Sequence, residues 1–151
     1  MNQLSLFGEK PCRKVIGTQG AKAVSNGKTA EATIYCILKE RGYTVEKQKF
    51  LGRNAYGKRI KVDFVVYGIE GMEKGLIIES KWQSSNGTTD EKFPYLVKNI
   101  QEYYPYPTIV VVDGGGFREG AISYMRNQVD GQKLIAVFTF GEFLSWINQT
   151  L

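Results

Sequence analysis

The fold depends on two segments of the chain, Arg59-Ile-Lys-Val-Asp-Phe-Val-Val-Tyr67 and Leu76-Ile-Ile-Glu-Ser-Lys-Trp-Gln83. Both are rich in apolar residues with β-branched and aromatic side chains, which indicates two strands. The residues between them, 68–75, begin and end with glycine and are few enough for a hairpin, so antiparallel pairing is expected. Charged residues interrupt both strands, at Asp63 and at Glu79.

Strand side chains alternate between the two faces of a sheet, so Glu79 and Lys81 share a face. The even-numbered residues from Ile60 to Val66 are apolar and are expected in the core, which leaves Lys61 and Asp63 on the other face. A register that places Asp63 opposite Glu79 brings the two carboxylates to about 5 Å at Cβ, beside the Lys81 ammonium.

Two carboxylates at this separation repel each other unless a proton or a cation lies between them. Mg²⁺ suits the position because it binds one or two carboxylates together with water and phosphate oxygens. Such an ion would polarise a phosphoryl oxygen and lower the pKa of a bound water, while Lys81 orients that water and stabilises developing charge. The alternative interpretation is a salt-bridged trio on a solvated sheet face. The apolar residues around each charged residue favour a functional site.

The rest of the chain alternates helical and strand patterns around this hairpin. Its order is αβββαβαβα, which predicts an α/β fold with a central mixed sheet flanked by helices. Residues 1–27 are expected to form an N-terminal arm and residues 28–151 the folded domain. Thr88 and Glu91 stand at capping-box spacing, and Pro94 falls in the first turn of the helix that follows. The expected helices are 28–41, 90–103, 118–127 and 141–148, and the expected strands are 43–50, 59–67, 76–83, 108–112 and 134–140.

The amino-acid composition excludes several kinds of chemistry. The chain contains no histidine, which rules out Ser-His-Asp triads, HNH nucleases and His-ligated zinc. Its two cysteines, Cys12 and Cys36, are too few to close a zinc site. No apolar run approaches the ~20 residues of a membrane span, and Met1-Asn2-Gln3 does not begin a signal peptide. A cytoplasmic protein without a membrane partner is therefore expected.

Positive charge is concentrated in the first part of the chain. Residues 1–61 contain 13 Lys+Arg and 4 Asp+Glu, a net charge of +9, whereas residues 62–151 contain 7 and 11, a net charge of −4. Clusters of Lys and Arg bind nucleic-acid phosphates and release counterions, so DNA is a candidate partner; a solvated basic surface is the alternative. The candidate DNA-binding residues near the turn between the first two strands are Arg53, Asn54, Lys58, Arg59 and Lys61.

These patterns together resemble the PD-(D/E)XK nuclease superfamily, whose restriction-endonuclease-like αβββαβ core carries Asp on the second strand and Glu-x-Lys on the third. Val62-Asp63 and Glu79-Ser80-Lys81 carry the match, with valine where the family's motif has proline, and the element order agrees from about residue 25 to 140. The resemblance implies that Asp63 and Glu79 bind the metal, that the Ser80 carbonyl adds a ligand, and that Lys81 serves the attacking water.

The same resemblance implies further site residues. Many members have a glutamate on the first helix near the site, which singles out Glu31; a solvent-exposed helix glutamate is the alternative. Gln83 shares the face of Lys81 and is expected to contact the metal-bound water or a phosphate. The polar loop after Gln83 resembles the region that follows the catalytic strand in some type II restriction endonucleases, where short side chains suit phosphate contacts. The candidate phosphate-binding residues in this loop and in the later glycine-rich loop are Ser84, Ser85, Asn86, Thr88, Thr89 and Arg118.

The expected function is that of a Mg²⁺-dependent DNA endonuclease that hydrolyses phosphodiester bonds, similar to type II restriction enzymes. Cutting both strands needs two sites related by two-fold symmetry, so a homodimer is expected. A structure-selective repair or recombination nuclease, such as a Holliday-junction resolvase, is the second candidate. A catalytically silent DNA-binding or protein-interaction module is the third, and the intact set of Asp63, Glu79 and Lys81 argues against it.

Gln3-Leu4-Ser5-Leu6-Phe7 resembles the pentapeptide by which bacterial DNA-processing proteins dock on the replicative sliding clamp. Leu6 and Phe7 would enter an apolar pocket, while the Gln3 amide fixes the register through hydrogen bonds. The alternative is an apolar arm packed on the protein's own core or on a second subunit. The candidate partner-binding residues are Gln3, Leu4, Leu6 and Phe7.

If residues 3–7 are such a tether, a synthetic peptide of residues 1–9 should bind a sliding clamp in the micromolar range, as expected for a short segment that orders on binding. Replacing Leu6 and Phe7 by alanine should eliminate this binding, measured by fluorescence anisotropy, because the apolar side chains supply most of the affinity. An arm packed on the protein's own core predicts no peptide binding, and a lower melting temperature when residues 1–8 are deleted.

Overall fold

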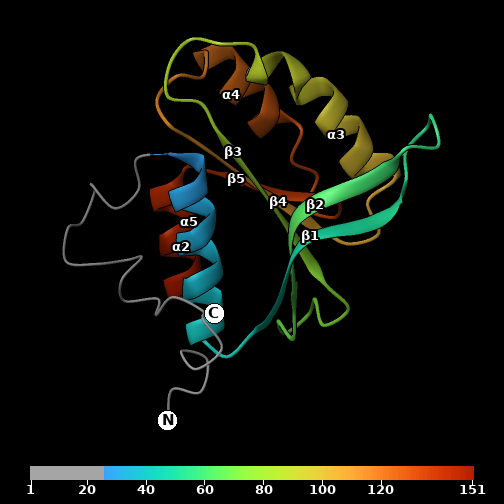
Figure 1. Ribbon diagram of the computed structural model, residues 1–151, viewed down its shortest axis with the longest axis vertical. Coiled ribbons are helices and arrows are strands. Elements are labelled where there is room, and N and C mark those ends of the chain that lie inside the picture. Colours follow the sequence, from blue (N-terminus) through green and yellow to red (C-terminus); the bar gives the residue numbers. More distant parts are fainter. Residues whose placement is uncertain (1–25) are drawn as a thin grey trace.

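The computed structural model describes residues 26–151 and contains a five-stranded sheet with helices on both faces (Figure 1). In sheet order the strands are β1 (Thr44–Arg53), β2 (Arg59–Tyr67), β3 (Leu76–Trp82), β4 (Thr108–Asp113) and β5 (Leu134–Phe138). The pairs β1–β2 and β2–β3 are antiparallel, whereas β3–β4 and β4–β5 are parallel. The expected mixed sheet is therefore confirmed.

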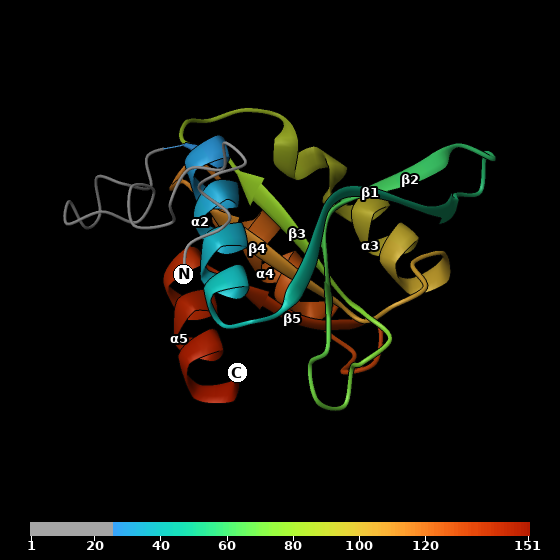
Figure 2. The same cartoon turned by 60° about the horizontal axis from the view of Figure 1, so that its bottom comes forward.

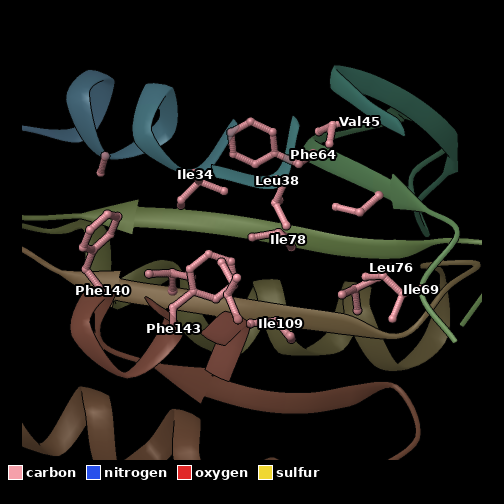
Figure 3. Packing of buried hydrophobic residues seen from close by; sticks show 14 residues of the cluster. Ile34, Leu38, Val45, Phe64, Ile69, Leu76, Ile78, Ile109, Phe140 and Phe143 are labelled. Carbon is pink, nitrogen blue, oxygen red and sulfur yellow. The ribbon is translucent and has the colours of Figure 1, made fainter. Parts of the chain in front are cut away.

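Helices bury apolar side chains against both faces of this sheet. They are α2 (Gly27–Glu40), α3 (Phe93–Glu102), α4 (Glu119–Asn127) and α5 (Phe140–Thr150), and a 3-10 turn, η3 (Thr89–Lys92), precedes α3. On one face α2 and α5 pack around Ile78 and Ile109 (Figure 3). On the other face α3 and α4 pack around Ile77 and Val110. None of the helices within residues 26–151 is long and apolar enough to cross a membrane.

Local capping decides where several helices begin. The Asn26 side chain caps α2, which begins at residue 27 rather than 28. A capping box at Thr139 begins α5. The predicted capping box at Thr88 is wrong, because its side chain makes no cap hydrogen bond and the expected helix 90–103 is divided into η3 and α3. Pro94 lies in the first turn of α3, as predicted.

The β1–β2 hairpin changes the face that it buries partway along β2. Phe64 and Val66 are buried with α2 and α5, whereas Ile60 and Val62 are buried with α3 and α4. All four even-numbered residues are buried, as predicted, but they lie on two faces of the sheet instead of one. The regular alternation along β2 is interrupted at Asp63. Between Asp63 and its tip, the hairpin extends away from α2 and α5 (Figure 2).

The interruption in β2 has a counterpart in β1. Gln48, which the register places opposite Asp63, has φ 52°, in the left-handed region that residues other than glycine rarely adopt. Glu46 and Lys49, which a regular strand would place on opposite faces, form an ion pair across this residue. Both strands of the hairpin therefore change faces together, at the position of Asp63.

A glycine-rich loop after β4 passes very close to the end of β3. A Cβ atom at Gly114 would lie 2.5 Å from the Gln83 carbonyl oxygen, and one at Gly116 would lie 2.4 Å from the Ser85 amide nitrogen. The Gly116 N–H donates to the Gln83 carbonyl at 2.6 Å. Only glycine allows this approach, so the loop accommodates the backbone of residues 83–85.

Gly116→Ala should lower the free energy of unfolding by about 1–3 kcal/mol, the usual cost of overpacking, because the atoms it meets belong to the backbone. Gly120→Ala is the matched control, since this exposed α4 residue has nothing within 4 Å of an added Cβ and alanine favours a helix. Urea unfolding of both variants measures the difference. A Gly116 variant as stable as the wild type would contradict the close packing of the two loops.

Candidate active site

The strands β2 and β3 separate at Asp63. Their ladder of paired residues ends at Phe64 and Ile78, and the next positions in this register are Asp63 and Glu79, as expected. In place of a further backbone pair, Asp63 Oδ2 accepts a hydrogen bond from the Ser80 N–H at 2.8 Å. Because β3 continues alongside β4 beyond this point, the two acidic residues stand at a fork in the sheet.

Glu79 is buried between an ammonium and a phenol. Its side chain is 3% exposed, with Oε2 3.1 Å from Lys81 Nζ, and its Oε1 accepts a hydrogen bond from the Tyr104 hydroxyl at 3.3 Å. Burial raises the pKa of Glu79 to about 7, with Lys81 lowering it and Asp63 raising it. A carboxylate in this position is stabilised by any further positive charge. Tyr104, which follows α3, was not singled out by the sequence.

Lys81 is a charged group among carboxylates. Burial disfavours its ammonium, but Glu79, Asp63 and Glu31 outweigh burial and raise the pKa of Lys81. Glu31 comes from α2, and its own pKa is raised by burial and by Asp63 and lowered by Lys81. The structure thus places Glu31 within electrostatic reach of the fork, at the position where α2 meets β2 and β3.

A divalent cation at the fork would be held by few protein ligands. Within residues 26–151, no three acidic, histidine or cysteine side chains are grouped as a complete metal cluster. Asp63 and Glu79 offer two carboxylates beside the Ser80 backbone, and Mg²⁺ needs only one or two when water and phosphate oxygens complete its shell. These donors therefore fit Mg²⁺ bound together with a phosphate-containing substrate.

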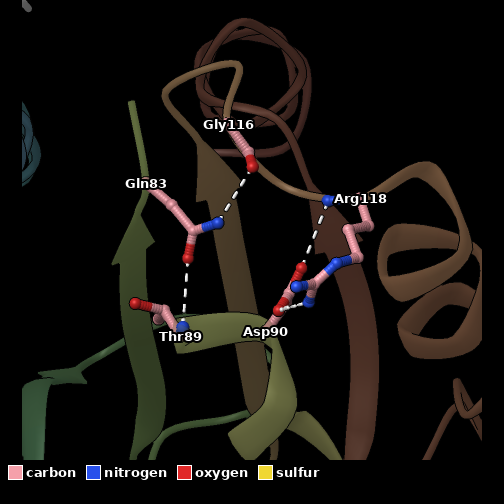
Figure 4. Close-up of polar contacts among 5 residues, drawn as sticks. All are labelled: Gln83, Thr89, Asp90, Gly116 and Arg118. Carbon is pink, nitrogen blue, oxygen red and sulfur yellow. Dashed lines mark hydrogen bonds and ion pairs between the residues drawn. The ribbon is translucent and has the colours of Figure 1, made fainter. Parts of the chain in front are cut away.

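Gln83 joins two loops at the end of β3 (Figure 4). The residue is 7% exposed, its Nε2 donates to the Gly116 carbonyl at 2.9 Å, and its Oε1 accepts from the Thr89 N–H at 3.1 Å. Its amide therefore has partners other than the expected metal-bound water or phosphate. Through these contacts Gln83 positions the two loops relative to β3. They also occupy the backbone N–H of Thr89, a residue expected to contact phosphate.

A buried ion pair joins η3 to the start of α4 (Figure 4). Asp90 is 5% exposed and accepts hydrogen bonds from the Arg118 N–H at 3.2 Å and from the Arg118 guanidinium at 2.5 Å. The Arg118 side chain is 58% exposed, so it also faces solvent, where a phosphate can reach it. The remaining candidate phosphate contacts, Ser84, Ser85, Asn86 and Thr88, are exposed on the loop that precedes η3.

Asn54 forms the turn of the β1–β2 hairpin. Its Oδ1 accepts hydrogen bonds from the N–H groups of Tyr56 and Lys58, and its Nδ2 donates to the Tyr95 hydroxyl of α3 at 2.6 Å. The side chain expected to contact DNA is thus engaged within the protein. It shapes the tip of the hairpin and fixes the tip against α3.

The cationic side chains of the hairpin lie at the surface. Arg53 donates to the Gly57 carbonyl at 2.7 Å, and the Arg59 guanidinium lies 3.8 Å from the centroid of the Phe50 ring. Phe50 is 47% exposed and Tyr56, at the tip, is 85% exposed. Exposed aromatic rings beside cations are typical of surfaces on which nucleobases stack, and no pattern in the sequence had marked these two rings. Lys47 of β1 is exposed, as are all four candidate DNA-binding cations of the hairpin, Arg53, Lys58, Arg59 and Lys61.

The forked mixed sheet and its acidic residues define a domain of the nuclease type. A family model of the PD-(D/E)XK nuclease superfamily domain matches residues 22–151, and the protein belongs to this superfamily. No curated protein and no solved structure matches the chain. Residues 3–7, with the resemblance to a clamp-binding segment, lie outside the residues that the structure describes, and clamp docking stays a prediction.

In the metal-free protein, the Glu79 carboxyl should titrate with a pKa of about 7, above its ordinary value of 4.5. The folded protein then holds this proton more tightly than the unfolded chain does. The resulting contribution to stability is full below pH 4.5 and is lost as the pH rises through about 7. Carbon-13 NMR of the side-chain carboxyls measures the titration.

Two variants test the cause of this shift. Asp63→Asn should lower the pKa of Glu79 because it removes a negative neighbour, whereas Glu102→Gln, at an exposed position on α3, should leave it unchanged. A Glu79 pKa near 4.5 in the wild type would contradict the burial described here.

Proposed function

We propose that the protein is a Mg²⁺-dependent endonuclease that hydrolyses phosphodiester bonds in DNA. The observation that carries this proposal is the meeting of Asp63 and Glu79 at the fork of β2 and β3, with Lys81 Nζ 3.1 Å from Glu79. The chain belongs to a nuclease superfamily, and it keeps together the carboxylates and the ammonium that metal-assisted hydrolysis uses. A module that only binds DNA would not need a buried carboxylate at this position.

The surroundings of each residue suggest its role. Asp63 and Glu79, with the Ser80 carbonyl, would hold the ion, which when bound polarises a phosphoryl oxygen and lowers the pKa of water. Lys81, which its acidic neighbours keep protonated, donates hydrogen bonds to the attacking water and to the negative charge that develops on the phosphate. Glu31, from α2, accepts a hydrogen bond from the same water. Gln83 supports the site by holding the loops at the end of β3.

The substrate is double-stranded DNA in this proposal, and the enzyme acts as type II restriction endonucleases do. The exposed cationic residues of the hairpin and the exposed polar residues of the loop before η3 bind phosphates of the substrate. Each chain carries one set of Asp63, Glu79 and Lys81, so cutting both strands takes a homodimer with two-fold symmetry.

The exposed rings of Phe50 and Tyr56 favour a second candidate function. Unpaired bases at a branch point can stack on aromatic side chains, so a structure-selective nuclease of the Holliday-junction resolvase kind would use these rings. Docking of residues 3–7 on a sliding clamp would suit this second role. Incubation with plasmid and with four-way-junction DNA separates the two: discrete fragments support restriction, and paired nicks at the junction support resolution.

Asp63→Asn and Glu79→Gln should each abolish Mg²⁺-dependent cleavage, yet preserve or tighten DNA binding, because each removes a negative charge that repels phosphate. Lys81→Ala should lower turnover by roughly 10²-fold or more, the scale of lost electrostatic stabilisation in a preorganised site. Glu102→Gln, on exposed α3 surface, is the control and should cleave as the wild type does. Cleavage is followed on gels and binding by fluorescence anisotropy. Full activity of the Asp63 or Glu79 variant would refute the assignment of the site.

Replacing Arg53, Lys58 and Arg59 by glutamine should weaken DNA binding and flatten its dependence on salt. Each phosphate contact that is lost reduces the log–log slope by about 0.9 on duplex DNA. Lys74→Gln is the control, since this exposed lysine lies in the β2–β3 connection, at the opposite end of β2 from the tip. The slope is measured by anisotropy over a salt series. An unchanged slope in the triple variant would place the DNA-binding surface elsewhere on the protein.

A further inference from the structure

We propose that Gln48 is a positioning residue of the active site, whose side-chain amide orients the Asp63 carboxylate for binding a divalent cation. The inference rests on the proposed metal-dependent function and concerns a residue on β1, outside the Asp63 and Glu79-x-Lys81 positions. Its support comes from three features of the hairpin: the backbone at Gln48, the contact of its amide, and its exposure.

The backbone at Gln48 is held in an unfavourable conformation. Among residues 26–151, it is the non-glycine residue with a positive φ, 52°, and it lies inside a strand rather than in a turn. Side chains with a Cβ atom rarely adopt this region, and glutamine is not among the residues that adopt it most readily. Strained backbone of this kind persists where the surrounding structure enforces it, and it is frequent at active sites.

The amide of Gln48 reaches the carboxylate at the fork. Its Nε2 lies 3.4 Å from Asp63 Oδ1, while Asp63 Oδ2 accepts the 2.8 Å hydrogen bond from the Ser80 N–H. One oxygen of Asp63 thus faces the amide from β1 and the other accepts a hydrogen bond from β3, and the two contacts together orient the carboxylate. Each carboxylate oxygen can accept more than one bond, so the amide leaves Asp63 able to bind a cation.

The chemistry of an amide suits this position. Lysine or arginine would place a positive charge beside Asp63 and compete with a bound cation, whereas the amide donates a hydrogen bond without a net charge. Gln48 is exposed, so its amide is not held there by burial, and the neighbouring ion pair of Glu46 and Lys49 leaves it free to face Asp63. Residues that orient metal ligands in this way typically change metal affinity by about 10–100-fold when they are replaced.

The variant Gln48→Gly distinguishes the effect of the side-chain amide from the effect of the backbone conformation. Glycine adopts φ 52° without strain, so the variant should melt at the same temperature as the wild type or higher, while the amide is lost. We expect its Mn²⁺ affinity, measured by isothermal titration calorimetry on the full chain, to fall by about 10-fold. Gln48→Leu, which keeps the Cβ and the bulk, should lose affinity to a similar extent. The Mg²⁺ concentration for half-maximal DNA cleavage should rise in parallel.

Each outcome decides the proposal. Mn²⁺ affinity within twofold of the wild type in the Gly or the Leu variant would overturn it, since either result leaves the amide without a role in metal binding. A loss that appears only together with a lower melting temperature would also overturn it, because misfolding would then explain the effect. Failure of the proposed function looks different: wild type and Asp63→Asn would bind Mn²⁺ equally and neither would cleave DNA, and the role of Gln48 would fail with it.

Discussion

The hydrogen bond from the Ser80 N–H to the Asp63 carboxylate stands where the β2–β3 ladder would otherwise continue. It lets the two strands part while it keeps Asp63 tied to β3, so that the hairpin arm and the parallel half of the sheet remain one structure. On β3, Glu79 is the residue before Ser80 and Lys81 is the residue after it. A fork stabilised by a side chain therefore places two carboxylates and an ammonium together without requiring a loop to carry them.

Burial of these charges is the electrostatic consequence of the fork. The Glu79 side chain is 3% exposed and has a pKa of about 7, and the acidic neighbours of Lys81 keep that residue protonated. Such an arrangement is costly in a metal-free protein, because a carboxylate is desolvated beside a second negative group. A divalent cation would relieve the repulsion, so the same arrangement that costs stability favours the ion of the proposed reaction. The Gln83 and Asp90–Arg118 contacts hold the loops at the end of β3 in place.

The two-residue repeat of β-strands was sufficient to predict the antiparallel pairing of β2 and β3, the register of that pair and the face shared by Glu79 and Lys81. The repeat could not predict where the alternation of faces would be interrupted. The left-handed backbone of Gln48 marks that position, and Ile60 and Val62 lie in the other half of the core as a result. Contacts between distant segments, such as Tyr104 with Glu79, leave no local pattern in the sequence. The glycines after β4 are plain in the sequence, but only the structure shows that the backbone of residues 83–85 passes close to them.

In the proposed function, Asp63 and Glu79 form one cation site at the fork of the sheet. A crystal structure of the wild-type protein grown with Mn²⁺, with data collected at a wavelength where manganese scatters anomalously, tests it most directly. We expect an anomalous peak about 2.0–2.3 Å from a carboxylate oxygen of each residue, the range for small divalent cations bound by oxygen. A fork without a peak at millimolar Mn²⁺, or a peak bound by other residues instead, would contradict it.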